Sequence, residues 1–150
     1  FCIYMISGLF GNHIPALAGI IPPAYSIQQN NISNSTGVCS DISVKYSDRL
    51  HLPPSFKGYF DYEDAKECAV MQNKPVFIDF TGHACFNCRR MEENVWIHPK
   101  VKEILDLDYI IVALYVDDKT PLLDDKEHKT LGKKNFDLQM DKFCSNAQPY

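Results

Sequence analysis

Two cysteines separated by two residues stand where the sequence predicts a turn from a β-strand into an α-helix. The strand is predicted over residues 76–81, which are rich in β-forming side chains, and the helix over residues 89–96. At such a turn Cys85 and Cys88 can close a small disulfide, or one sulfur can lie at the helix N-terminus, where a thiolate is stabilised. A thiolate is the species that attacks disulfides, so the motif in this context predicts redox chemistry.

Two other roles of the cysteine pair stay open at this point. A zinc site needs about four ligands, but the sequence has a single CxxC pair, and His83, His98 and Cys144 are scattered along the chain. A buried structural disulfide, or two inert thiols, is the second alternative. The strand-to-helix turn argues against it, because that turn usually lies exposed at the edge of an α/β sheet.

The segments around the pair predict a parallel βαβ unit. A helix is predicted from the N-cap Asp61 to about Gln72, with acidic residues in its first turn. Another helix is predicted to begin at Pro99, and an apolar run of strand length follows over residues 109–116. Two buried strands separated by helices favour parallel pairing.

The next segment, residues 117–147, is long and mixed in charge, and the sequence predicts a solvated insertion there. Leu131 and Gly132 are interpreted as the end of a helix and its C-cap glycine. No further structure is predicted for this segment.

Composition limits the classes of function. The formal net charge is -4, from 15 basic and 19 acidic residues, so nothing indicates a nucleic-acid partner. Six cysteines in 150 residues are too few and too unevenly spaced for a small disulfide-framework scaffold. The cysteines outside the pair are interpreted as small buried apolar side chains or bystanders: Cys2, Cys39, Cys68 and Cys144.

The N-terminal part of the chain predicts a membrane neighbour. Phe1 to Gly11 is apolar apart from one serine, and residues 1–23 are interpreted as the remnant of a transmembrane helix cut upstream. An ordinary buried helix is the alternative. No Lys or Arg precedes Lys45, which indicates a non-cytoplasmic flank. Residues 24–58, rich in Asn and Ser at first, are interpreted as an extracytoplasmic linker.

The residues around the pair resemble a known family, the C-terminal thioredoxin-like domain of the DsbD membrane thiol:disulfide interchange proteins. The resemblance covers roughly residues 60–150. It rests on the block from Lys74 to Glu92, and it continues through Glu93-Asn94-Val95-Trp96, His98-Pro99, the strand Ile110 to Val116 with Asp117-Asp118, and Gln148-Pro149-Tyr150.

The resemblance implies an α/β thioredoxin-like fold over residues 59–150, truncated after the cis-proline position, Pro149. A complete fold of that kind has a further strand, a hairpin partner and a last helix after this proline. We therefore expect that the 150-residue chain alone does not form a stable active domain.

Four residues are predicted to carry the chemistry. Cys85 is the expected attacking thiol because it is nearer the exposed turn, and Cys88, one helical turn in, is the expected resolving thiol. By resemblance, Asp79 matches a buried acid that assists proton transfer, and Glu92 an acid that raises the cysteine pKa. The alternatives are an Asp79 that faces water on an edge strand and a Glu92 on an ordinary helix surface.

Four further residues are predicted to face substrate or partner: His83, Phe86, Asn87 and Pro149. His83 departs from the common pattern, and it either favours thiolate at Cys85 when protonated or simply faces solvent in the turn. No cofactor is expected beyond the Cys85–Cys88 disulfide.

The resemblance also implies partners and a location. The domain would face the periplasm at a bacterial inner membrane. It would take electrons from a membrane-embedded cysteine pair of the same protein and pass them to a periplasmic thiol-disulfide protein. Two alternatives remain: a membrane-tethered reductase that acts directly on substrates such as apocytochromes, and a non-catalytic metal-binding or interaction module.

Overall fold

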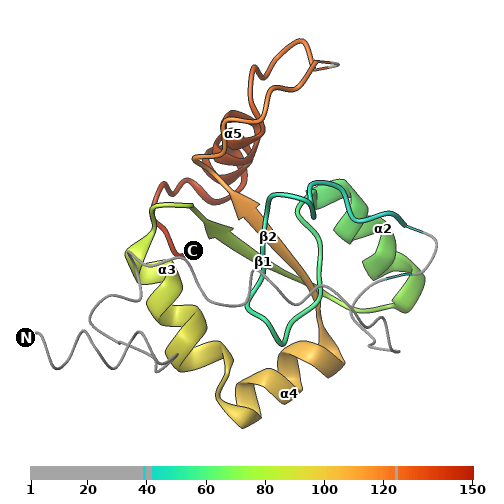
Figure 1. The fold of residues 1–150 in the computed structure, drawn as a ribbon. Coiled ribbons are helices and arrows are strands. Elements are labelled where there is room, and N and C mark those ends of the chain that lie inside the picture. The colour runs from blue at the N-terminus through green and yellow to red at the C-terminus, as the bar shows by residue number, and fades with distance from the viewer. Residues whose placement is uncertain (1–38, 40–41, 124) are drawn as a thin grey trace, which may run out of the picture.

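Two parallel β-strands form the centre of the structure, a computed structural model that describes residues 39, 42–123 and 125–150 (Figure 1). β1 pairs with β2 along its whole length, with Val76 opposite Ile110 and Thr81 opposite Tyr115. The predicted parallel βαβ unit is therefore confirmed. The elements in chain order are α2 (Tyr62–Gln72), β1 (Val76–Thr81), α3 (Phe86–Met91), the π-helical η3 (Glu92–Trp96), α4 (Pro99–Asp108), β2 (Ile110–Tyr115) and α5 (Leu131–Phe143).

Local sequence signals set the ends of the first helices. The side chain of Asp61 accepts hydrogen bonds from the backbone N–H groups of Glu63 and Asp64, so it caps α2 as predicted. Asn73 ends the helix in the left-handed conformation, with φ of 51°. Pro99 occupies the first turn of α4, where its missing N–H costs no hydrogen bond.

Both faces of the sheet are covered, which explains why the strands are almost continuously apolar. One face packs against α2, whose Ala65 and Cys68 have no exposed surface. The buried cluster on this side consists of Tyr59, Ala65, Cys68, Ala69, Phe80, Ile110, Val112 and Leu114. This cluster is the largest of the three buried clusters in the described residues and holds α2 against both strands.

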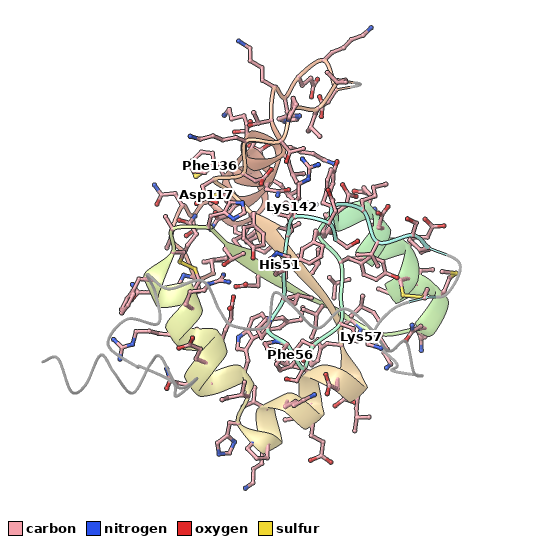
Figure 2. All side chains as sticks on the ribbon, in the orientation of Figure 1. His51, Phe56, Lys57, Asp117, Phe136 and Lys142 are labelled. Atoms are coloured by element: carbon pink, nitrogen blue, oxygen red, sulfur yellow. A yellow bond between two sulfur atoms is a disulfide. The ribbon has the colours of Figure 1, made fainter. Side chains whose placement is uncertain are left out.

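The opposite face of the sheet packs against η3 and α4. Phe77 and Ile111 contact Trp96 of η3 there, and Phe56 lies between the sheet and α4 (Figure 2). Side chains alternate across a strand, so Asp79 shares this face with Phe77. The strand therefore directs its one acidic side chain toward the crossover that carries the cysteine pair.

Backbone contacts also line the two outer edges of the sheet. Tyr59 pairs with β2: its N–H donates to the carbonyl oxygen of Ile111 at 2.8 Å, and its own carbonyl accepts from Ala113 at 2.9 Å. A Cβ on Gly58 would collide with the same Ile111 carbonyl, so only glycine permits this close approach. On the other edge, the N–H of Phe80 donates to the carbonyl oxygen of Tyr150 at 3.0 Å.

The second half of the predicted linker, residues 42–58, lies against this domain. Leu50 and Phe56 are buried in its two smaller apolar clusters. Cys39 forms a disulfide with Cys68 of α2, 29 residues further on. The interpretation of these two cysteines as bystanders was wrong, because a pairing over this distance depends on tertiary contacts that no local pattern records.

The interpretation of Leu131-Gly132 as a helix end was also wrong, because α5 begins there. The hydroxyl of Thr130 accepts from the N–H of Lys133 at 3.3 Å and caps the helix. Gly132 lies against the backbone of residues 116–118, where a Cβ would come within 2.5 Å of the carbonyl oxygen of Asp118. In the sequence, a glycine needed for close packing therefore looks the same as a glycine that ends a helix.

The proposed transmembrane remnant, residues 1–23, lies outside the described residues. Among the helices of residues 39, 42–123 and 125–150, none has the length and apolar character required to cross a bilayer.

Candidate functional site

The cysteine pair forms a disulfide at the start of α3. Cys85 is the N-cap residue, and its Sγ accepts a hydrogen bond from the N–H of Cys88 at 3.2 Å. The two Cα atoms are 5.3 Å apart. Cys85 is half-buried, whereas only 1 % of Cys88 is exposed. The structure therefore presents Cys85 to an incoming partner and keeps Cys88 behind it.

Asp117 holds the turn that leads into this helix (Figure 2). Its Oδ1 accepts from the backbone N–H of His83 at 2.9 Å, and its Oδ2 accepts from the N–H of Ala84 at 3.2 Å. A Cβ on Gly82 would lie only 3.0 Å from the same carboxylate. Sequence reasoning noted Asp117 as the residue after the second strand but missed this role. A signal for this contact was available, because parallel strands end at the same edge of a sheet, which brings Asp117 close to the turn after β1.

His83 lies beside a second acid rather than simply facing solvent. Its Nε2 is 2.9 Å from Oδ2 of Asp118, and its ring is 4.6 Å from the ring of Tyr115. Although burial raises it, the pKa of Asp118 is held below its ordinary value by hydrogen bonds from Thr120 and His83. His83, Asp118 and Thr120 line a pocket of about 580 Å³ next to the turn, together with Arg49, Asp117, Lys119 and Pro121.

Asp79 and Glu92 are both buried, with 5 % and 6 % of their surfaces exposed. The alternatives of a water-facing strand residue and a helix-surface residue were therefore wrong. Burial raises the pKa of Asp79 to about 7, and the nearby Arg89 guanidinium opposes this rise. Burial likewise raises the pKa of Glu92 to about 7, with Arg89 opposing and the charge of Asp79 adding to the rise. The charge of Asp79 therefore reaches Glu92.

Arg89 is the cation of this buried group. Its guanidinium forms an ion pair with Oε1 of Glu92 at 2.8 Å and donates to the hydroxyl of Thr81 at 2.8 Å. Arg89 and Arg90 are adjacent in the sequence but lie in different surroundings. Arg90 is exposed over the ring of Phe86 at 5.8 Å, but Arg89 points inward. A pattern of two adjacent arginines does not show which of them enters the core.

The remaining predicted partner-facing residues lie on the surface or at the end of the described chain. Phe86 and Asn87 are exposed in the first turn of α3. The peptide bond between Gln148 and Pro149 is cis. Gln139, fully buried in α5, holds this segment through hydrogen bonds with the carbonyl oxygen of Ala147 at 2.7 Å and the side chain of Gln148 at 3.0 Å.

Replacing Asp79 by Asn, or Glu92 by Gln, is expected to raise the free energy of unfolding above pH 7. Each carboxyl has a folded-state pKa of about 7, above its unfolded value of about 4. Their bound protons stabilise the folded chain fully below about pH 4, and this stabilisation is lost as the pH rises through 7.

Urea unfolding at about pH 5 and about pH 8 measures this effect. From about pH 5 to about pH 8, the free energy of unfolding of the parent chain should fall by about 2 kcal/mol more than that of either variant. Glu103→Gln on α4 is the control, because Glu103 is exposed and should follow the parent. Equal losses of unfolding free energy in the parent and both variants would show that burying the ionised carboxylates does not destabilise the folded chain.

The described part of the chain contains no cluster of side chains suited to bind a metal ion. There, no three His, Cys, Asp or Glu side chains lie together as ligands of one ion would. Both sulfurs of the CxxC pair are joined to each other.

A comparison with protein families agrees with this geometry. A family model described as thioredoxin-like matches residues 57–138, which is more than half of the chain. The match includes β1, the cysteine pair, the crossover helices and β2, and most of α5. The α/β arrangement, with the CxxC pair at the strand-to-helix turn, agrees with such a domain. The chain therefore belongs to the thioredoxin-like family.

Proposed function

We propose that this protein is a protein-disulfide reductase that exchanges dithiols and disulfides through Cys85 and Cys88. The observation that carries the proposal is the position of the two sulfurs at the start of α3, one accessible and one buried, within a thioredoxin-like fold. No cofactor enters the reaction, because the cysteine pair itself holds the two electrons that are exchanged.

The reaction begins with the reduced pair. The thiolate of Cys85 attacks one sulfur of a partner disulfide, forming a mixed disulfide and releasing the other partner sulfur as a thiolate. Cys88 then loses its proton and attacks Sγ of Cys85, which releases the second partner thiolate. The partner disulfide gains two electrons, and the protein is left with the Cys85–Cys88 disulfide. A dithiol donor returns it to the reduced form by the reverse sequence.

Asp79 and Glu92 fit the proton transfers of this cycle. A carboxyl with a pKa near 7 exchanges protons readily at neutral pH, so it can accept the proton of Cys88 and later return it. Their negative charge, when ionised, also opposes thiolate formation and keeps the pair from reacting too early. Neither acid needs to touch the partner, because Cys85 is the sulfur that does so.

The finer proposal places this exchange in a relay at a bacterial inner membrane. The domain would take electrons from a membrane-embedded cysteine pair and pass them to a periplasmic thiol-disulfide protein. The resemblance to DsbD around the cysteine pair supports this relay. The second disulfide, Cys39–Cys68, supports an oxidising compartment, since such bonds are rare in the cytosol.

Differential alkylation with mass spectrometry tests the exchange in a chain extended beyond residue 150 through the further strands that the resemblance implies. After mild reduction, Cys85 and Cys88 should both become labelled, and a glutathione redox buffer should restore their disulfide. Cys144 is an internal reference, because it is exposed and not in a disulfide. If Cys85 and Cys88 label fully in oxidising buffer, the redox proposal fails; zinc found in that protein would support the metal-binding alternative.

A further inference from the structure

The side chain of Arg89 joins three parts of the site. It follows the resolving cysteine directly in α3, yet its guanidinium reaches Thr81 at the end of β1 and Glu92 in η3, each at 2.8 Å. Thr81 has no exposed surface, and the side chains of Arg89 and Glu92 are 15 % and 8 % exposed. An arginine held this way inside a protein has a fixed position, because its Nη2 contacts acceptors on two different elements at once.

The groups around this cation are mostly acids. Asp79 lies on β1, Glu92 and Glu93 on η3, and Tyr115 on β2, and the charge of Arg89 acts on Asp79, Glu92 and Tyr115. Buried carboxyls resist ionising unless a cation offsets the cost. Arg89 is the cation that the structure places against them.

We propose that Arg89 is a positioning residue for disulfide exchange: its guanidinium, anchored on Thr81, fixes Glu92 and supplies the positive charge beside the buried acids Asp79 and Glu92. This inference rests on the proposed function. It adds Arg89 to the cysteines and acids that the exchange requires. Without the cation, both carboxyls would hold their protons at neutral pH, so neither could accept the proton that Cys88 must lose before it attacks Cys85.

The first experiment measures the carboxyls in the oxidised full chain, where the cysteines do not titrate. NMR titration of the Asp79 and Glu92 carboxyl carbons should show both pKa values raised by at least about one unit in Arg89→Gln. The matched control is Arg90→Gln, which removes the same charge from the next residue, on the surface, and should leave both titrations unchanged. Arg89→Lys keeps the positive charge, so its shift should be smaller.

The second experiment follows exchange. The rate at which glutathione disulfide oxidises the reduced chain is measured between about pH 5 and pH 9. In Arg89→Gln the pH midpoint should move upward in parallel with the carboxyl titrations, with a rate loss of at least about tenfold at neutral pH. Arg90→Gln should keep the parent profile, which separates a positioning role from a general effect of lost positive charge.

The outcomes distinguish this inference from the proposed function. A parent chain that does not react with glutathione disulfide contradicts the proposed function, whereas an active parent with unshifted carboxyls in Arg89→Gln overturns the role of Arg89. Shifted carboxyls with an unchanged exchange profile overturn it as well. If Arg89→Gln fails to fold, Thr81→Val removes one anchor of the guanidinium at nearly constant volume, and it must raise the pKa of Glu92 for the inference to stand.

Discussion

Cys85→Ser is expected to abolish disulfide exchange, with a loss of at least about 1,000-fold, because it removes the accessible sulfur that attacks the partner. Cys88→Ser should behave differently. Its Cys85 can still attack, but no second sulfur stands behind it to release the partner, so a mixed disulfide should accumulate through Cys85. The burial of Cys88 is the physical reason, since a partner cannot reach that sulfur directly.

Non-reducing gels and mass spectrometry of the trapped species measure both effects. Cys144→Ser is the matched control, since Cys144 is exposed and should be irrelevant to exchange. Trapping by Cys85→Ser instead of Cys88→Ser would show that the two roles are reversed. In host cells, a trapped thiol-disulfide protein supports the relay, and a trapped apocytochrome supports the tethered reductase.

The double variant Cys39→Ser and Cys68→Ser is expected to lose about 3 kcal/mol of unfolding free energy. The disulfide closes a loop with a sequence separation of 29, and cross-linking a loop of that size removes about 3.5 kcal/mol of chain entropy from the unfolded state. The loss should be visible locally too, because the bond ties the segment before α2 to that helix. Hydrogen exchange should therefore accelerate around Leu50, which is buried in the parent.

Urea unfolding in oxidising buffer provides the measurement for this variant. Cys144→Ser should change the unfolding free energy by less than about 0.5 kcal/mol, as expected for an exposed residue without such a bond. If the double variant unfolds at the same urea concentration as the parent, the segment before α2 is held by packing alone.

The parts of the fold that could be predicted have local causes. The β-rich run at residues 76–81, the cap at Asp61 and the proline at Pro99 each act within a few residues, so the sequence contains the whole signal. The position of the cysteine pair followed from the same elements. The roles of its two sulfurs follow from burial, and for Asp79 a buried position was implied by the resemblance rather than by a local pattern.

The parts that could not be predicted depend on contacts between distant residues. Cys39 meets Cys68, and Asp117 meets the turn at His83, across 29 and 34 positions of the sequence. The inward turn of Arg89 depends on Thr81, which lies on another element. Gly132 is the opposite case. Its small size is required by the backbone of residues 116–118, but the sequence suggested a local role at the end of a helix.

The distance between the two disulfides has a consequence for repeated turnover. Cys68 belongs to the helix that leads into the start of β1, and Cys85 follows the end of that strand, with α2 and α3 on opposite sides of the sheet (Figure 1). A six-residue strand spans roughly 20 Å, far more than the contact that sulfur needs to attack sulfur. A thiolate at Cys85 is thus insulated from the Cys39–Cys68 bond of its own chain. The molecule can cycle between redox states without scrambling the bond that keeps it folded.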